Sequence, residues 1–171
     1  MKPMLCDREF EGPMTSPFAK IIVLGYYDGP ISGLLQCADC PTAYRFELIA
    51  WDSNQDNRVF SLAEVDSDVF ESVIHTLASV QEPKWPIWVV DWKFESTTEE
   101  KRIHDSIDRA LEKASTAKLV IATPHIAKDI TMCREITDEE RTVLPTEGDY
   151  PQQHHWTYWQ QHLGLNRSAG G

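Results

Sequence analysis

Residues 43–51 read A-Y-R-F-E-L-I-A-W, and this stretch decides the fold class. Its side chains follow the two-residue period of a β-strand, in which neighbours point to opposite faces. One face holds Tyr44, Phe46, Leu48 and Ala50, and the other holds Arg45, Glu47, Ile49 and Trp51. The first face is entirely apolar, so we predict a strand that turns this face toward a core.

Strand-like runs also lie on both sides of this stretch. I-I-V-L-G-Y-Y follows Ala19-Lys20, and residues 31–36 and 58–62 are short runs of the same type. Asp28-Gly29-Pro30 and residues 37–41 are turns, because Gly tolerates positive φ and Pro fixes its own φ. Connections this short favour an antiparallel meander over about residues 20–62.

The second half of the chain has a helical period instead. We predict helices from Asp66 or Ser67 to about Val80, from about Thr98 to Ser115, and over residues 156–165, which carry Trp156 and Trp159. Residues 87–94 and 117–123 are predicted strands, and the long helix between them indicates a crossover between parallel strands. The prediction is an α+β fold: a mixed sheet with an N-terminal antiparallel meander and helices packed on at least one face.

Three segments make up the predicted domain organisation. Residues 1–18 hold three prolines and are predicted to form an irregular N-terminal arm. Residues 19–165 form a single α+β domain, and residues 166–171 a disordered tail. A chain of 171 residues is long enough to bury one ordinary hydrophobic core without the support of disulfide bonds or a metal ion.

The charge balance narrows the classes of partner. Lys and Arg number 16 against 27 Asp and Glu, and the net charge is −11. No basic stripe is present that could bind nucleic acid, and an anionic membrane surface would repel the chain. The N-terminus lacks an apolar signal-peptide core, so we expect a cytoplasmic protein. The leading functional prediction is a non-catalytic protein-interaction or regulatory module that acts on a basic partner.

The pair Cys37-x-x-Cys40 supports a zinc-stabilised domain, which is the third of the functional hypotheses. Two thiolates at this spacing can grip a tetrahedral ion from one turn, and the same spacing serves dithiol redox exchange. A structural zinc needs further ligands, and Cys6 and Cys133 stand alone in the sequence. A turn without metal also explains the pattern, so Cys37 and Cys40 are candidate zinc ligands only.

A small-molecule enzyme with dispersed polar residues is the second hypothesis, ahead of the zinc-stabilised domain. The chain contains no nucleotide-binding, hydrolase, metalloprotease or kinase motif. Asp28 lies at the end of a strand in a glycine turn, and His125 follows the apolar strand 117–123. Ends of buried strands are common ligand sites, so Asp28, Asp91 and His125 are the candidate catalytic residues.

The loop D-S-N-Q-D-N at residues 52–57 starts like a calcium loop. Asp52, Asn54 and Asp56 occupy the first, third and fifth positions, but the sixth is Asn57 instead of Gly and the twelfth is Ala63 instead of Glu. A polar hairpin loop explains these residues as well.

The two turns of the meander are expected to lie apart. Asp28-Gly29-Pro30 and Cys37–Pro41 flank one strand of about 20 Å, at roughly 3.3 Å per residue. We therefore predict that the Asp28 carboxylate and the thiol pair do not belong to one site.

Overall fold

A computed structural model describes residues 3–52, 54, 56–92, 98–112, 116–145 and 153–165. Its main sheet has seven strands in the order β11-β9-β7-β6-β5-β4-β8. The strands are β1 (Met4–Leu5), β2 (Arg8–Glu9), β3 (Met14–Thr15), β4 (Phe18–Tyr26), β5 (Pro30–Cys37), β6 (Ala43–Asp52), β7 (Asn57–Val65), β8 (Ile87–Val89), β9 (Leu119–Thr123), β10 (Asp129–Ile130) and β11 (Met132–Glu135). The helices are α1 (Ser67–Ala78), α2 (Thr98–Leu111), α3 (Asp138–Arg141) and α4 (Gln153–His162).

The predicted α+β class and the antiparallel meander are confirmed. β4, β5, β6 and β7 pair in sequence order, each antiparallel to the next. One detail of the strand over residues 43–51 differs from the prediction. The ladder between β6 and β7 shifts register between Leu48 and Ala50, so Ile49 and Ala50 both pack with the C-terminal helix. A β-bulge of this kind interrupts the strict alternation of faces.

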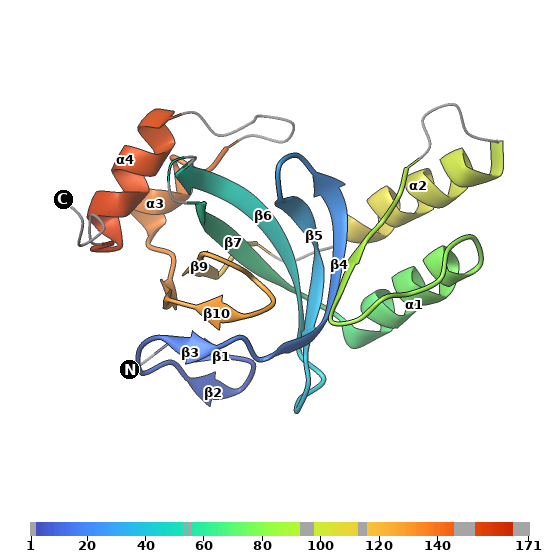
Figure 1. Cartoon of the computed structure of the whole chain (residues 1–171), viewed down its shortest axis with the longest axis horizontal. Coiled ribbons are helices and arrows are strands. Elements are labelled where there is room, and N and C mark those ends of the chain that lie inside the picture. The colour runs from blue at the N-terminus through green and yellow to red at the C-terminus, as the bar shows by residue number, and fades with distance from the viewer. Residues whose placement is uncertain are drawn as a thin grey trace.

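Two separate groups of helices cover one face of the sheet. Figure 1 shows α1 and α2 beside β4 and β5, and α4 near the end of β6. Over β4 and β5, the helices α1 and α2 bury the apolar cluster that includes Ile22 and Leu34. Over β6, β7 and β9, α4 buries a second cluster around Val59 and Val120. On the opposite face, Phe46 and Phe60 lie in a third cluster together with the N-terminal segment. Both faces of the sheet are therefore covered, each by different elements.

The crossover from β8 to β9 spans the sheet. β8 pairs parallel to β4, and β9 pairs antiparallel to β7 on the other side of the meander. The alternation of the meander makes β8 and β9 run in the same direction, but β7, β6, β5 and β4 lie between them. β8 is also shorter than the predicted strand 87–94. Trp88 and Val90 are buried as expected, and Phe94 lies outside the described residues.

The N-terminal segment, which the sequence predicts to be irregular, contains three short strands. β1 and β2 form a hairpin, and β3 pairs with β10 from the second half of the chain. Leu5, Cys6 and Phe10 are buried in the same cluster as Phe46. The segment thus covers one face of the sheet. Residues 166–171, the predicted tail, lie outside the described part of the chain.

The helices follow their predicted apolar stripes. Phe70, Val73 and Leu77 of α1 are buried, as are Trp156 and Trp159 of α4. Gly164 ends the C-terminal helix with a φ of 63°, the left-handed conformation that glycine adopts without strain. Among the helices that the structure describes, none combines the length and the apolarity needed to cross a bilayer.

Gly33 in β5 offers a test of this sheet. A Cβ at this position would lie 1.9 Å from the carbonyl oxygen of Ile22 and 2.9 Å from the ring of Phe46. Gly33→Ala is expected to lower the free energy of unfolding by about 3 kcal/mol, because backbone and a buried ring must both move. Gly25→Ala is the matched control, since its nearest neighbour is the rotatable Ser32 hydroxyl. Urea unfolding measures both, and equal stabilities would contradict the packing of β5 against β4 and β6.

Candidate metal centre and ligand pocket

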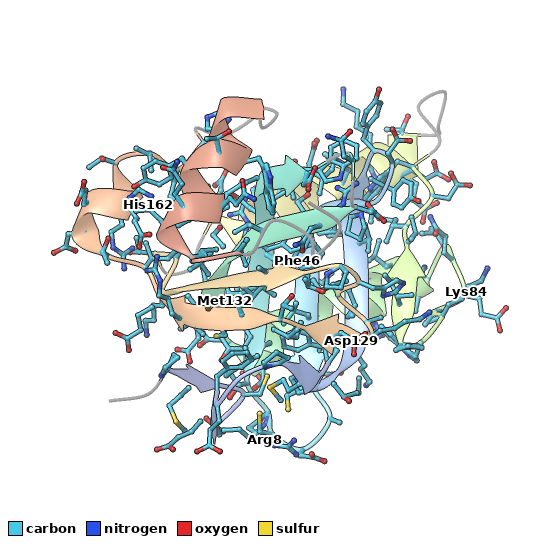
Figure 2. All side chains as sticks on the ribbon, turned by 60° about the vertical axis from the view of Figure 1, so that its left-hand side comes forward. Arg8, Phe46, Lys84, Asp129, Met132 and His162 are labelled. Carbon is cyan, nitrogen blue, oxygen red and sulfur yellow. The ribbon has the colours of Figure 1, made fainter. Side chains whose placement is uncertain are left out.

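Three cysteines meet at one end of the sheet. The sulfur atoms of Cys6, Cys37 and Cys40 all lie within 4.8 Å of one another. Cys37 ends β5 and Cys40 lies in the following turn, as the sequence predicts, while Cys6 comes from the distant N-terminal hairpin. Cys6 and Cys37 are buried, and Cys40 is half-buried. Figure 2 shows sulfur atoms close to the labelled Arg8, which follows this hairpin turn.

An unusual turn places Cys6 in this cluster. Leu5 pairs with Arg8, so Cys6 and Asp7 alone connect β1 to β2. Their φ angles are 52° and 61°, the left-handed values of a type I′ turn. Asn-Gly is the preferred sequence for this turn, and residues with a Cβ at such angles cost of order 1 kcal/mol or more. The backbone of the β1–β2 hairpin is therefore strained at Cys6, whose sulfur lies close to those of Cys37 and Cys40.

Polar groups of neighbouring residues surround the three sulfurs. The Tyr44 hydroxyl accepts a hydrogen bond of 3.2 Å from the backbone N–H of Cys6. Burial raises the pKa of the Cys6 thiol, and the nearby sulfurs of Cys37 and Cys40 raise it further. Burial also raises the pKa of Cys40, although hydrogen bonding to Thr42 opposes this effect.

The chemistry of this cluster suits a soft or borderline metal ion. Thiolates are the ligands that Zn²⁺ and other thiophilic ions prefer. Across the described residues, no other set of three or more His, Cys, Asp or Glu side chains converges in this way. The cluster could therefore hold a metal ion through three sulfur ligands, with one tetrahedral position left for water or an added ligand.

Cys133 is not part of the cluster. It lies in β11, paired with Ile121 of β9, and it is buried. Burial alone raises the pKa of its thiol to about 12. A thiol of this kind is inert, so Cys133 acts as an apolar core residue.

A pocket lies at the opposite end of the sheet from the cysteines. Its volume is about 290 Å³. It is lined by Tyr26, Asp28, Gly29, Pro30, Asp56, Arg58, Phe60, Ile87, Val89, Thr123, Pro124, His125 and Ile126. Two of the candidate catalytic residues, Asp28 and His125, thus line the same pocket. Asp28 precedes β5 and Cys37 ends it, which confirms that the Asp28 turn and the thiol pair are separate.

Asp91, the third candidate catalytic residue, lies elsewhere. It is exposed and lines a different recess together with Gln81 and Glu100. Its backbone exchanges two hydrogen bonds with the Gln81 side chain, of 3.1 and 2.7 Å. Asp91 therefore belongs to a surface loop and is not one group with Asp28 and His125.

The loop over residues 52–57 has the geometry of a polar hairpin connection. Asp52 is buried, and its carboxylate accepts a hydrogen bond of 3.1 Å from the backbone N–H of Asn54. Asp56 instead faces Arg58, with 3.8 Å between its carboxylate oxygen and Nε. Asp52 and Asp56 are not in the one converging ligand group found among the described residues. Ser53 and Gln55 lie outside those residues.

Arg58 supports the turn that carries Asp28. Its guanidinium donates to the carbonyl oxygens of Asp28 at 2.6 Å and of Pro30 at 3.0 Å. It also lies over the Trp51 ring, 4.3 Å from the centroid. A Cβ on Gly29 would approach the guanidinium to 2.5 Å and displace it from its two carbonyl contacts, and the φ of 140° also favours glycine. The buried Arg58 thus holds the Asp28-Gly29-Pro30 turn in place.

Comparison with known proteins identifies no relative. No family model, curated protein or solved structure matches the chain.

Sequence reasoning missed one residue of the cysteine cluster. Cys6 has no second cysteine at a ligand spacing, and nothing in its neighbourhood predicts a fold toward the Cys37-Cys40 turn. The weak signal is Cys6-Asp7 between two short runs that can pair as strands. Arg58 was missed as well, because an arginine at a strand start is usually a surface residue.

Proposed function

We propose that this protein is a zinc-binding domain in which Cys6, Cys37 and Cys40 hold the ion. The observation that carries the proposal is the convergence of three sulfur atoms within 4.8 Å from two distant segments. Zinc is favoured because it has no redox chemistry and binds thiolates tetrahedrally at about 2.3 Å. An ion at this place would bring the three sulfurs closer together without moving the strands that carry them.

The role that we assign to the ion is structural, although only three of its four ligands are protein sulfurs and the fourth position would hold water or an added ligand. It links the turn of the β1–β2 hairpin to the end of β5, two segments that no ladder of the sheet joins. The binding free energy offsets the strain at Cys6 and Asp7, and it fixes the N-terminal segment over the sheet face around Phe46. Metal binding also removes the protons from the buried thiols, since only thiolates are ligands.

The metal content of the purified protein tests this proposal. Protein prepared without a histidine tag is expected to contain about one zinc per chain by elemental mass spectrometry. Cys37→Ser should lose this zinc, because the remaining two sulfurs are not enough for tight binding. Cys133→Ala is the matched control and should keep it. Less than about 0.1 zinc per chain after growth with zinc would refute the proposal.

A basic protein partner stays a prediction. It is supported by the net charge of −11, which speeds association with a basic surface. It is compatible with a structural zinc ion, since an ion that fixes the N-terminal segment leaves the outer surface available to a partner.

A further inference from the structure

The geometry points to a second site: we propose that the pocket at the Asp28 end of the sheet binds a small ligand with an ammonium group and a carbonyl oxygen, as in an amino acid amide. The pocket is lined by none of the cysteines, and the proposed binding does not depend on zinc. It depends on the shape of the sheet, on the Asp28 carboxylate and on His125.

The curl of the sheet creates the pocket. Ile87 and Val89 come from β8 and Thr123 from β9, yet all three line the same cavity. Four strands, β7, β6, β5 and β4, lie between β8 and β9 in the sheet. The sheet must therefore curl enough to bring β8 and β9 to the walls of the same cavity. At the other end, the N-terminal segment packs against the same sheet face. A cup of about 290 Å³ suits a small molecule, and mouths of curled sheets are frequent ligand sites.

The charge that faces a ligand comes from Asp28. Arg58 contacts the Asp28 and Pro30 carbonyls and the Asp56 carboxylate, and therefore serves to hold the turn. The Asp28 carboxylate forms no hydrogen bond or ion pair with any residue that the structure describes. Its φ of 53° lies in the left-handed region, and Arg58 donates a hydrogen bond to the carbonyl oxygen of the same residue. Asp28 and Tyr26 line the same pocket, and a carboxylate together with an aromatic ring attracts an organic cation.

His125 adds a hydrogen-bond donor to the pocket. The backbone N–H of Ala127 donates to its Nδ1 at 3.2 Å, so Nδ1 carries no proton. The neutral imidazole then has its proton on Nε2, where it can donate. No bond from Nε2 to another described residue is present. A ligand carbonyl oxygen would accept from Nε2, while Ile87 and Val89 receive an apolar side chain.

Three matched compounds separate these contributions. Leucinamide has the ammonium group, the carbonyl and an apolar side chain. 4-Methylpentanamide lacks only the ammonium group, and 3-methylbutylamine lacks only the carboxamide. Chemical-shift titration of the full chain should show leucinamide binding at about millimolar Kd, the affinity typical of a ligand this small. Each of the other compounds should bind roughly three- to five-fold more weakly.

Two variants assign the contacts to residues. Asp28→Asn keeps the turn, because Asn adopts positive φ readily, and should weaken leucinamide roughly three- to five-fold while leaving 4-methylpentanamide unchanged. His125→Asn retains an acceptor for the Ala127 N–H and should weaken only the two amides. Asp91→Asn, outside the pocket, should change none of the three affinities.

The proposal is overturned by any of three results. The first is that leucinamide shifts no resonance of a pocket residue up to tens of millimolar, well above the expected Kd. The second is that 4-methylpentanamide binds as tightly as leucinamide, which would make the pocket a neutral apolar site. The third is that Asp28→Asn binds leucinamide like the wild type although its thermal midpoint shows it to be folded.

Discussion

Removing zinc with a chelator is expected to lower the free energy of unfolding by about 4 kcal/mol, measured against protein with zinc at a thousand times its Kd. The reason is that the proposed ion would bind the folded arrangement of Cys6, Cys37 and Cys40 and would have no equivalent site in the unfolded chain. For a chain of 171 residues this corresponds to a fall of roughly 10 °C in the melting temperature. Calorimetry with and without chelator measures the difference.

Two variants show whether this loss comes from the cluster. Cys40→Ser should have a low melting temperature that chelator does not change further, because its site is already incomplete. Cys133→Ala should respond to chelator as the wild type does, since its buried thiol lies in β11 outside the cluster. A wild-type melting temperature that is the same in chelator and in zinc would contradict a structural ion.

Replacing Arg134 by methionine is expected to destabilise the fold by about 3–5 kcal/mol. The two guanidinium nitrogens of Arg134 donate to both carboxylate oxygens of Glu140, at 2.7 and 2.6 Å. The Glu140 side chain is only 2% exposed, so losing Arg134 leaves a buried carboxylate without its cation. Chemical unfolding at neutral pH measures the effect.

The stabilisation by the Arg134–Glu140 pair is expected to decrease at low pH. The hydrogen bonds from Arg134 lower the pKa of Glu140 to about 2, below its value of roughly 4.3 in an unfolded chain. The stabilisation by this pair is therefore complete above about pH 4.3 and is lost as the pH falls through the folded pKa. Arg134→Met removes the cause of the shift, so the gap between wild type and variant should narrow steadily from pH 4 to pH 2.

Control substitutions test the role of burial. Lys118→Met removes an exposed pair with Glu64, 3.4 Å apart, and should cost less than about 1 kcal/mol. The double variant Arg134→Met, Glu140→Gln should regain much of the loss, because a neutral amide replaces the buried charge. An Arg134→Met protein as stable as Lys118→Met would show that the Glu140 pair contributes no more than a surface contact.

The local pattern of the chain determined most of its secondary structure. Alternation over residues 43–51 predicts β6, and the short turns around Asp28 and Cys37 predict antiparallel neighbours. The apolar stripes of α1, α2 and α4 also predict the buried residues, Trp159 among them. These features depend on contacts between residues close in the chain, which a sequence displays directly.

The two sites depended on contacts between distant residues. The Cys37-x-x-Cys40 pair was visible, but Cys6 joins it only because the N-terminal hairpin folds over the sheet through a left-handed turn. Asp28 and His125 were candidates on separate grounds, and it is the curl of the sheet that places them in one pocket with Arg58. Backbone twist and bulges set that curl, and they add up over many strands. The sequence alone therefore determined the strands, helices and turns, whereas only the tertiary structure decided which side chains meet, because that depends on the summed geometry of the whole sheet.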